Sequence, residues 1–229
     1  YSLRDVTATV DSIPLICGSI LSKKLAEGIQ GLIMDIKWGN GAFMQNINDA
    51  KKLGDLIEYV SIKNNINIVN CYTSMHQPLG KASGLWCEID ECISALKGLG
   101  PKDLMEVVFH LGESALKMAN ISDPINKLEK TISSGSAYKK FLSMVEKHSG
   151  DIKLLLDKNT NSPKYIKNIK AKKNGYINHI NTRKVGMSLI ELGAGRVKKI
   201  DKLDYTAGII WKRKLGEQVS KNDTILNIF

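Results

Sequence analysis

Three side chains near the start of the chain have the types and spacing to bind a planar ligand that carries carbonyl oxygens. Ser19 and Lys23 are four positions apart, so on an α-helix they differ by only about 40° around the axis and project from the same side. Arg4, in the segment before that helix, adds a fork of hydrogen-bond donors. The spacing alone also allows Lys23 to be an ordinary solvated residue and Ser19 a small packing residue.

The helix that must carry Ser19 and Lys23 is indicated by its end signals. Asp11 or Ser12 can cap its N-terminus, Pro14 falls in its first turn and Gly28 ends it. Cys17 lies on the same helix, and we expect it to be a buried small residue rather than a nucleophile.

An α/β unit follows this helix. The apolar run 32–36 has strand length and leads into the turn 39–41, a helical pattern covers 48–63, and a second apolar run covers 66–72. A strand, a helix and a strand in this order imply a right-handed crossover and a parallel sheet. The Gly-, Pro- and Ser-rich segment 73–84 then becomes a candidate wall of a ligand site.

The rest of the chain changes character near its middle. Helical patterns cover 86–97, 101–119 and 123–147, and we expect a boundary between residues 150 and 175. The end, 207–229, alternates like short antiparallel strands joined by tight turns. We therefore predict an α/β fold with a mixed or parallel sheet flanked by helices, followed by a smaller α+β domain.

Composition excludes several classes of protein. The chain has 229 residues, 43% of them hydrophobic, which is enough for one large domain or two small ones. No apolar stretch approaches the roughly 20 residues of a membrane-spanning helix. His110 and Glu113 are one helical turn apart but lack a third metal ligand, so we interpret them as surface or packing residues. No CxxC pair occurs among the four cysteines, which argues against a disulfide framework or a zinc knuckle and favours a reducing, cytoplasmic setting: Cys17, Cys71, Cys87 and Cys92.

The net charge of +10 invites a nucleic-acid interpretation, which the distribution of charge weakens. Residues 1–150 carry 16 basic and 16 acidic side chains, and residues 151–229 carry 17 and 7. The excess is mostly scattered Lys, with three Arg and few aromatic side chains to stack on bases. We therefore favour a solvated Lys-rich surface, while a nucleic-acid binder would show affinity that falls steeply with salt.

Several longer segments resemble the thymidine and pyrimidine-nucleoside phosphorylase family, in order and over essentially the whole chain. They are YSLRDVTATVDSIPLICGSILSKKLAEG (1–28), MDIKWGNGAFM (34–44), QPLGKASG (77–84), LKGLGPKDLMEVV (96–108) and LGAGRVKKIDKLDYTAGIIWKRKLGEQVSKND (192–223). The resemblance implies reversible phosphorolysis, in which phosphate attacks the anomeric carbon of a pyrimidine nucleoside and releases the free base.

The resemblance also implies roles for individual residues. Arg4, Ser19 and Lys23 match the residues that bind the pyrimidine, with Arg4 and Lys23 as the catalytic cations on its exocyclic oxygens. Negative charge moves onto the base as the glycosidic bond breaks, so cationic donors there bind the transition state better than the ground state. Asp5 matches an acidic residue that orients the site, or serves as a salt-bridge partner, and Tyr1 lines the base pocket.

A monovalent cation is a second implication of the resemblance, although no obligatory cofactor is expected. The family's potassium site uses main-chain carbonyls at positions matching Leu79 and Ala82 and the carboxylate matching Glu91, oxygen ligands suited to a hard cation. Leu85 departs from the family, which usually has Asn there. The alternative for Glu91 is a surface carboxylate on a helix.

The domain organisation is expected to follow the same family. Residues 1–28 would be the remnant of a helical domain, 29–150 the central glycosyl transferase domain and 151–229 an incomplete basic C-terminal domain. The family's phosphate-binding segment would precede Tyr1, so we expect the chain to be a C-terminal portion that cannot catalyse phosphorolysis alone. The whole protein is expected to be a homodimer that uses a pyrimidine nucleoside and phosphate, without nucleic acid or membrane partners.

Two alternatives remain open at this point. One is a catalytically inactive remnant that keeps the fold, and the other is a related phosphoribosyltransferase of the same architecture. The preference between thymidine and uridine also remains open.

Overall fold

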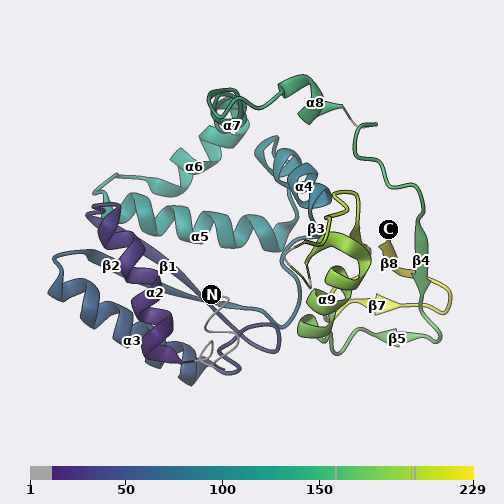
Figure 1. Ribbon diagram of the computed structural model, residues 1–229, viewed down its shortest axis with the longest axis horizontal. Helices are drawn as coiled ribbons and strands as arrows, with labels where there is room; N and C mark the ends of the chain where they lie inside the picture. Colours follow the sequence, from purple (N-terminus) through teal and green to yellow (C-terminus); the bar gives the residue numbers. More distant parts are fainter. Residues whose placement is uncertain (1–11, 158, 197, 199) are drawn as a thin grey trace. The chain divides into compact units, whose positions relative to one another are not determined.

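The computed structural model describes residues 12–157, 159–196, 198 and 200–229, and it divides them into two compact units (Figure 1). The first unit runs up to Met75 and includes Phe109–Pro124; the second comprises His76–Val108 and Ile125–Phe229. The first contains α2 (Ile13–Ala26), β1 (Gly31–Trp38), α3 (Ile47–Lys63), β2 (Asn67–Ser74) and the C-terminal part of α5 (Lys102–Met118). The second contains β3 (Ala82–Gly84), α4 (Trp86–Leu96), α6 (Pro124–Ser133), α7 (Ser136–Lys147), α8 (Ile152–Leu156), β4 (Lys167–Lys170), β5 (Gly175–Tyr176), α9 (Thr182–Leu189), a π-helix (Ile190–Ala194), β6 (Gly208–Trp211), β7 (Gln218–Val219) and β8 (Thr224–Ile228).

The first unit contains the predicted strand, helix and strand. β1 pairs in parallel with β2 from Gly31 opposite Asn67 to Trp38 opposite Ser74, and α3 connects them, which confirms the parallel crossover. Asn46 caps α3 because its side chain accepts a hydrogen bond from the Asp49 amide at 3.0 Å. The α/β fold class predicted from the sequence is therefore confirmed.

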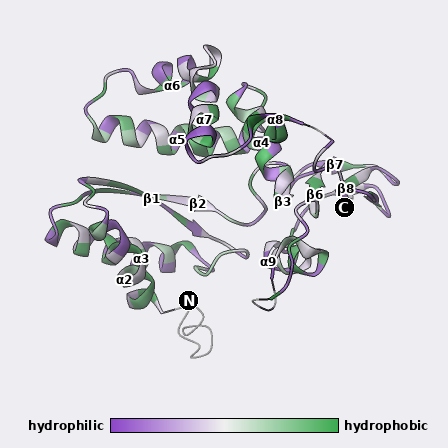
Figure 2. Ribbon diagram, turned by 45° about the horizontal axis from the view of Figure 1, so that its top comes forward, coloured by the Kyte–Doolittle hydropathy of each residue, from purple (hydrophilic) through white to green (hydrophobic). Residues whose placement is uncertain are grey.

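The core of the first unit lies between α2, α3 and one face of the two strands. Figure 2 shows both helices on the same side of β1 and β2. Alternate residues of β1 point to that core, as the period of two in a strand requires, and Ile36 is 3% exposed. Cys17 is 2% exposed in the same core, which confirms its interpretation as a packing residue, and Ile57 of α3 is fully buried.

Replacing Ile57 with alanine is expected to lower the free energy of unfolding by about 2–5 kcal/mol, because it removes buried methylene groups and leaves a cavity. The measurement is urea unfolding followed by circular dichroism. Ile62→Ala on the same helix is the matched control, since Ile62 is 60% exposed and its loss should cost less than about 1 kcal/mol. Equal losses for the two variants would contradict this assignment of the core.

The second unit has an antiparallel sheet in the order β3, β6, β8, β4. The predicted alternation at 207–229 is confirmed in β6, β7 and β8, all of which pair antiparallel. β3 joins this sheet from far along the chain, with Ala82 opposite Ile210 and Gly84 opposite Gly208. The side chain of Trp211 is 4% exposed, and its Nε1 donates to Ser83 Oγ at 3.1 Å, which ties β3 to the centre of the sheet.

Two helical regions differ from the sequence-based expectations. The single helix expected over 123–147 is wrong, because α6 and α7 are separate and Gly135 between them has a φ of +69°. This left-handed conformation favours glycine and cannot continue a helix. α9 follows the cap Asn181, whose side chain accepts from the Lys184 amide at 3.0 Å, and no helix was expected there. Within the described residues no helix is long and apolar enough to cross a membrane.

Candidate functional site

α2 carries Ser19 and Lys23, the two predicted site residues that are four positions apart. Pro14 lies in the first turn of this helix as predicted, and the helix ends just before Gly28, whose φ is +68°. Ser19 is half-buried and Lys23 is exposed, one turn further along the helix. The adjacent Lys24 pairs with Glu27 at 2.9 Å. The helix anchors itself through the buried Cys17 and Leu21, so its polar side chains have a fixed support.

The remaining predicted pyrimidine-binding residues are Tyr1, Arg4 and Asp5. All three lie outside the residues that the structure describes. Their roles therefore stay predictions.

A polar cluster that the sequence analysis did not assign occupies the carboxyl ends of β1 and β2. Lys37 Nζ lies 2.5 Å from Asp35 Oδ2 and donates to Thr73 Oγ1 at 2.7 Å, while the Thr73 hydroxyl donates to Asp35 Oδ1 at 2.5 Å. The cluster projects from the opposite face of β1 to Ile36, because Asp35 and Lys37 alternate with it. Its charges compensate one another, so we interpret it as a support for the end of β1, which enters the Gly39-Asn40-Gly41 turn.

The predicted cation-binding residues lie in the second unit, around the segment between β2 and α4. Glu91 on α4 accepts two backbone hydrogen bonds through Oε1, from the Lys81 amide at 2.8 Å and from the Ala82 amide at 3.0 Å. The structure thus brings Glu91 and Ala82 together. Leu79 lies in the same segment, and its side chain is 37% exposed.

The local backbone explains why this segment needs glycine. Gly80 has a φ of +71°, and a Cβ atom there would collide with the Glu91 carboxylate. Burial raises the pKa of Glu91 more than the two backbone donors lower it, and the nearby Asp103 raises it further, whereas Lys214 lowers it. A cation beside this carboxylate would offset the cost of burying its charge.

The donor set of this segment fits a hard monovalent cation, since it offers main-chain carbonyls and one carboxylate. Two other carbonyls of the segment already bind a cationic side chain. The ammonium of Lys214 is hydrogen-bonded to the Pro78 carbonyl and to the Gly80 carbonyl, the latter at 2.5 Å. Leu79 and Ala82 carbonyls with the Glu91 carboxylate are the atoms that would hold such an ion.

Replacing Glu91 with alanine is expected to destabilise the protein by about 1–3 kcal/mol, because the Lys81 and Ala82 amides lose their acceptor. Chemical denaturation measures the change. Glu91→Gln keeps an acceptor oxygen at the same distance from the backbone, so its loss of stability should be no more than half of the loss in Glu91→Ala. A glutamine variant as unstable as the alanine variant would show that these two hydrogen bonds do not carry the effect.

Lys214 and Asp103 are residues that the sequence analysis did not single out. Lys214 lies in the turn between β6 and β7, its Nζ is 3.2 Å from Asp103 Oδ2, and Asp103 Oδ2 also accepts from the Gly80 amide at 3.2 Å. No local signal could have found this contact, because Lys214 is 136 positions from Pro78 in the sequence. The resemblance covered Lys214 without giving it a role.

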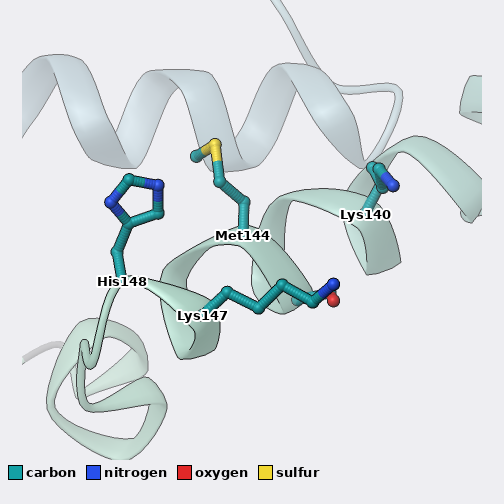
Figure 3. Close-up of a pocket in the computed structure, with 5 residues that line it drawn as sticks. Lys140, Met144, Lys147 and His148 are labelled. Carbon is teal, nitrogen blue, oxygen red and sulfur yellow. The ribbon is translucent and has the colours of Figure 1, made fainter.

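The metal-ligand and thiol candidates of the sequence analysis lie in the described part of the chain. No group of three or more His, Cys, Asp or Glu side chains there could hold a metal ion, and Glu113 pairs with Lys117 at 2.7 Å. Burial raises the pKa of Cys87 to about 11, so its thiol stays protonated at neutral pH. A pocket along α7 is lined by Lys140, Met144 and Lys147 with His148, as Figure 3 shows, and it contains none of the predicted site residues.

Comparison with known proteins decides the family. The model of the pyrimidine nucleoside phosphorylase C-terminal domain matches residues 176–229. A thymidine phosphorylase of Metamycoplasma hominis is 41% identical over 234 aligned positions, which cover all of this chain and 86% of that relative. The chain belongs to the pyrimidine-nucleoside phosphorylase family.

Other relatives of the phosphorylase family are longer than this chain. A pyrimidine-nucleoside phosphorylase of Staphylococcus aureus (strain USA300) is 39% identical over 236 aligned positions, which cover all of this chain and 54% of the relative. The chain thus spans about half the length of that phosphorylase. The identities of 41% and 39% over all of this chain confirm the resemblance drawn from the sequence. The enzymes of this phosphorylase family are pentosyltransferases.

Proposed function

We propose that the protein catalyses the reversible phosphorolysis of pyrimidine nucleosides. An oxygen of inorganic phosphate attacks the anomeric carbon, the bond from that carbon to N1 of the base breaks, and its electron pair leaves with the base. The base takes up a proton and departs neutral, and the sugar becomes α-ribose or α-deoxyribose 1-phosphate. Thymidine, uridine and deoxyuridine are the proposed substrates.

The observation that carries the proposal is the placement of Ser19 and Lys23 one turn apart on α2, in a chain that matches a thymidine phosphorylase along its whole length. We assign Lys23 and Arg4 to the exocyclic oxygens of the base, Ser19 to its N3 edge, Tyr1 to the wall of the base pocket and Asp5 to the orientation of the site. The cations stabilise the charge that develops on the leaving base, and this stabilisation is greatest in the transition state.

The finer features of the proposal follow the family. The proposed domain limits are 1–28, 29–150 and 151–229, with the phosphate site outside this chain and a homodimer as the working form. A potassium ion held by Leu79, Ala82 and Glu91 would neutralise buried negative charge beside the segment 77–84. The proposed location is the cytoplasm, where the four free thiols stay reduced.

The test is an assay of the full-length protein with thymidine, in the presence and absence of inorganic phosphate. We expect release of thymine only when phosphate is present, together with an equal amount of deoxyribose 1-phosphate, both measured by chromatography. Uridine and deoxyuridine in parallel define the substrate preference. A well-folded protein that releases no base would favour the inactive remnant, and turnover only with a phosphoribosyl pyrophosphate would favour the related transferase.

A further inference from the structure

The turn between β6 and β7 is fastened to the segment 77–84 by one partly buried cation. Lys214 has a side chain only 12% exposed, and its ammonium is bound by the Pro78 and Gly80 carbonyls and by Asp103. The next residue, Leu215, donates its amide to Gln77 Oε1 at 2.9 Å. The turn therefore contacts the segment 77–84 at Gln77, Pro78 and Gly80.

The ligands of the Lys214 ammonium resemble those of a bound monovalent cation. The ammonium donates hydrogen bonds to two carbonyls and forms an ion pair with the Asp103 carboxylate, so both kinds of oxygen ligand surround it. Burying a charged group is costly unless it is paired and hydrogen-bonded, and Lys214 meets both conditions.

We propose that Lys214 is the built-in cation of the segment 77–84, a positioning residue that orders this segment whether or not a potassium ion is also bound there. The inference rests on the proposed function only in treating Leu79, Ala82 and Glu91 as the oxygen ligands that this segment presents. By fixing the carbonyls on either side of Leu79, the ammonium holds the backbone in the shape that places Ala82 against Glu91. A free potassium ion becomes necessary for this order only when the ammonium is removed.

The test is hydrogen–deuterium exchange of the peptide covering 77–84 in the full-length protein. Samples are compared in potassium chloride and in N-methylglucamine chloride at equal ionic strength. We expect the wild-type exchange rate to agree within about twofold between the two salts. Lys214→Met should exchange at least about tenfold faster in N-methylglucamine, and potassium should restore much of the protection.

Matched variants separate the effect of the Lys214 contacts from general effects of charge and folding. Lys212→Met removes an exposed lysine two positions earlier in the same turn and should leave the exchange unchanged. Lys214→Gln keeps N–H donors without the charge and takes the place of Lys214→Met if the methionine variant does not fold. Its exchange should also be faster in N-methylglucamine and be slowed by potassium. Circular dichroism confirms folding in each case.

Three outcomes would overturn the proposal. They are wild-type protection that requires potassium, a folded Lys214 variant that exchanges at the wild-type rate, and faster exchange that potassium does not reverse. The last outcome would make Lys214 a simple cross-link. Because exchange needs no turnover, these results stand apart from the phosphorolysis assay, and either proposal can fail while the other holds.

Discussion

Replacing Lys23 with alanine in the full-length protein is expected to lower kcat/KM for thymidine phosphorolysis about a hundredfold or more. This corresponds to a loss of roughly 2.7 kcal/mol of transition-state stabilisation. The physical reason is that negative charge develops on the base carbonyls as the glycosidic bond breaks, and a cation directed at those oxygens stabilises the transition state more than the bound nucleoside. The measurement is the initial rate of thymine release over a range of thymidine concentrations.

Lys24→Ala is the matched control for this prediction. Lys24 is the next residue on α2, carries the same charge and pairs with Glu27, so its loss should change kcat/KM by no more than about twofold. If the two variants lose activity equally, the effect belongs to the charge of the helix rather than to Lys23. A rise in KM with kcat unchanged would show that Lys23 binds the nucleoside and the transition state equally.

Replacing Trp211 with alanine is expected to lower the free energy of unfolding of the protein by about 3–5 kcal/mol. Trp211 is 4% exposed in the core of the second unit, where it packs with Ile180 and Ile209, and its indole donates to Ser83. Removing the ring leaves a large cavity and removes the side-chain hydrogen bond to Ser83 of β3, while the backbone pairing of β3 with β6 remains. Thermal and urea unfolding measure the loss of stability.

Trp211→Phe separates the two contributions of this side chain. Phenylalanine keeps most of the buried area but loses the hydrogen bond to the Ser83 hydroxyl and a small part of the buried ring, so it should cost about 1–2 kcal/mol. An alanine variant no less stable than the phenylalanine variant would contradict the assignment of Trp211 to the core. Hydrogen–deuterium exchange of the peptide 82–84 should also become faster in the alanine variant, because β3 loses the hydrogen bond between Ser83 and Trp211.

The elements of the first unit were accessible from the sequence because each has a strong local signal. Apolar periodicity identified α3, and strand-length apolar runs identified β1 and β2. The break between α6 and α7 was missed because the helical period continues on both sides of Gly135, whose left-handed φ alone separates them. α9 was missed because Lys and Gly residues interrupt its short apolar pattern.

The candidate site was predictable only where its residues lie close together in the sequence. Ser19 and Lys23 share one helix, so their spacing was sufficient to group them. The resemblance placed Ala82 and Glu91 at one cation site, which stays a prediction, and the structure shows the Ala82 amide donating to Glu91. The attachment of Lys214 to Pro78 and Gly80 depends on the pairing of β3 with β6, a non-local contact that leaves no local periodic signal.

The measurement that tests the central claim most directly is a crystal structure of the full-length protein with thymine and phosphate. We predict electron density for the pyrimidine ring beside α2, with its polar edge within hydrogen-bond distance, about 2.7–3.2 Å, of Ser19 Oγ and Lys23 Nζ. Phosphate should lie on the sugar side of the ring. Thymine bound away from α2 would contradict the assignment of Ser19 and Lys23 to the base.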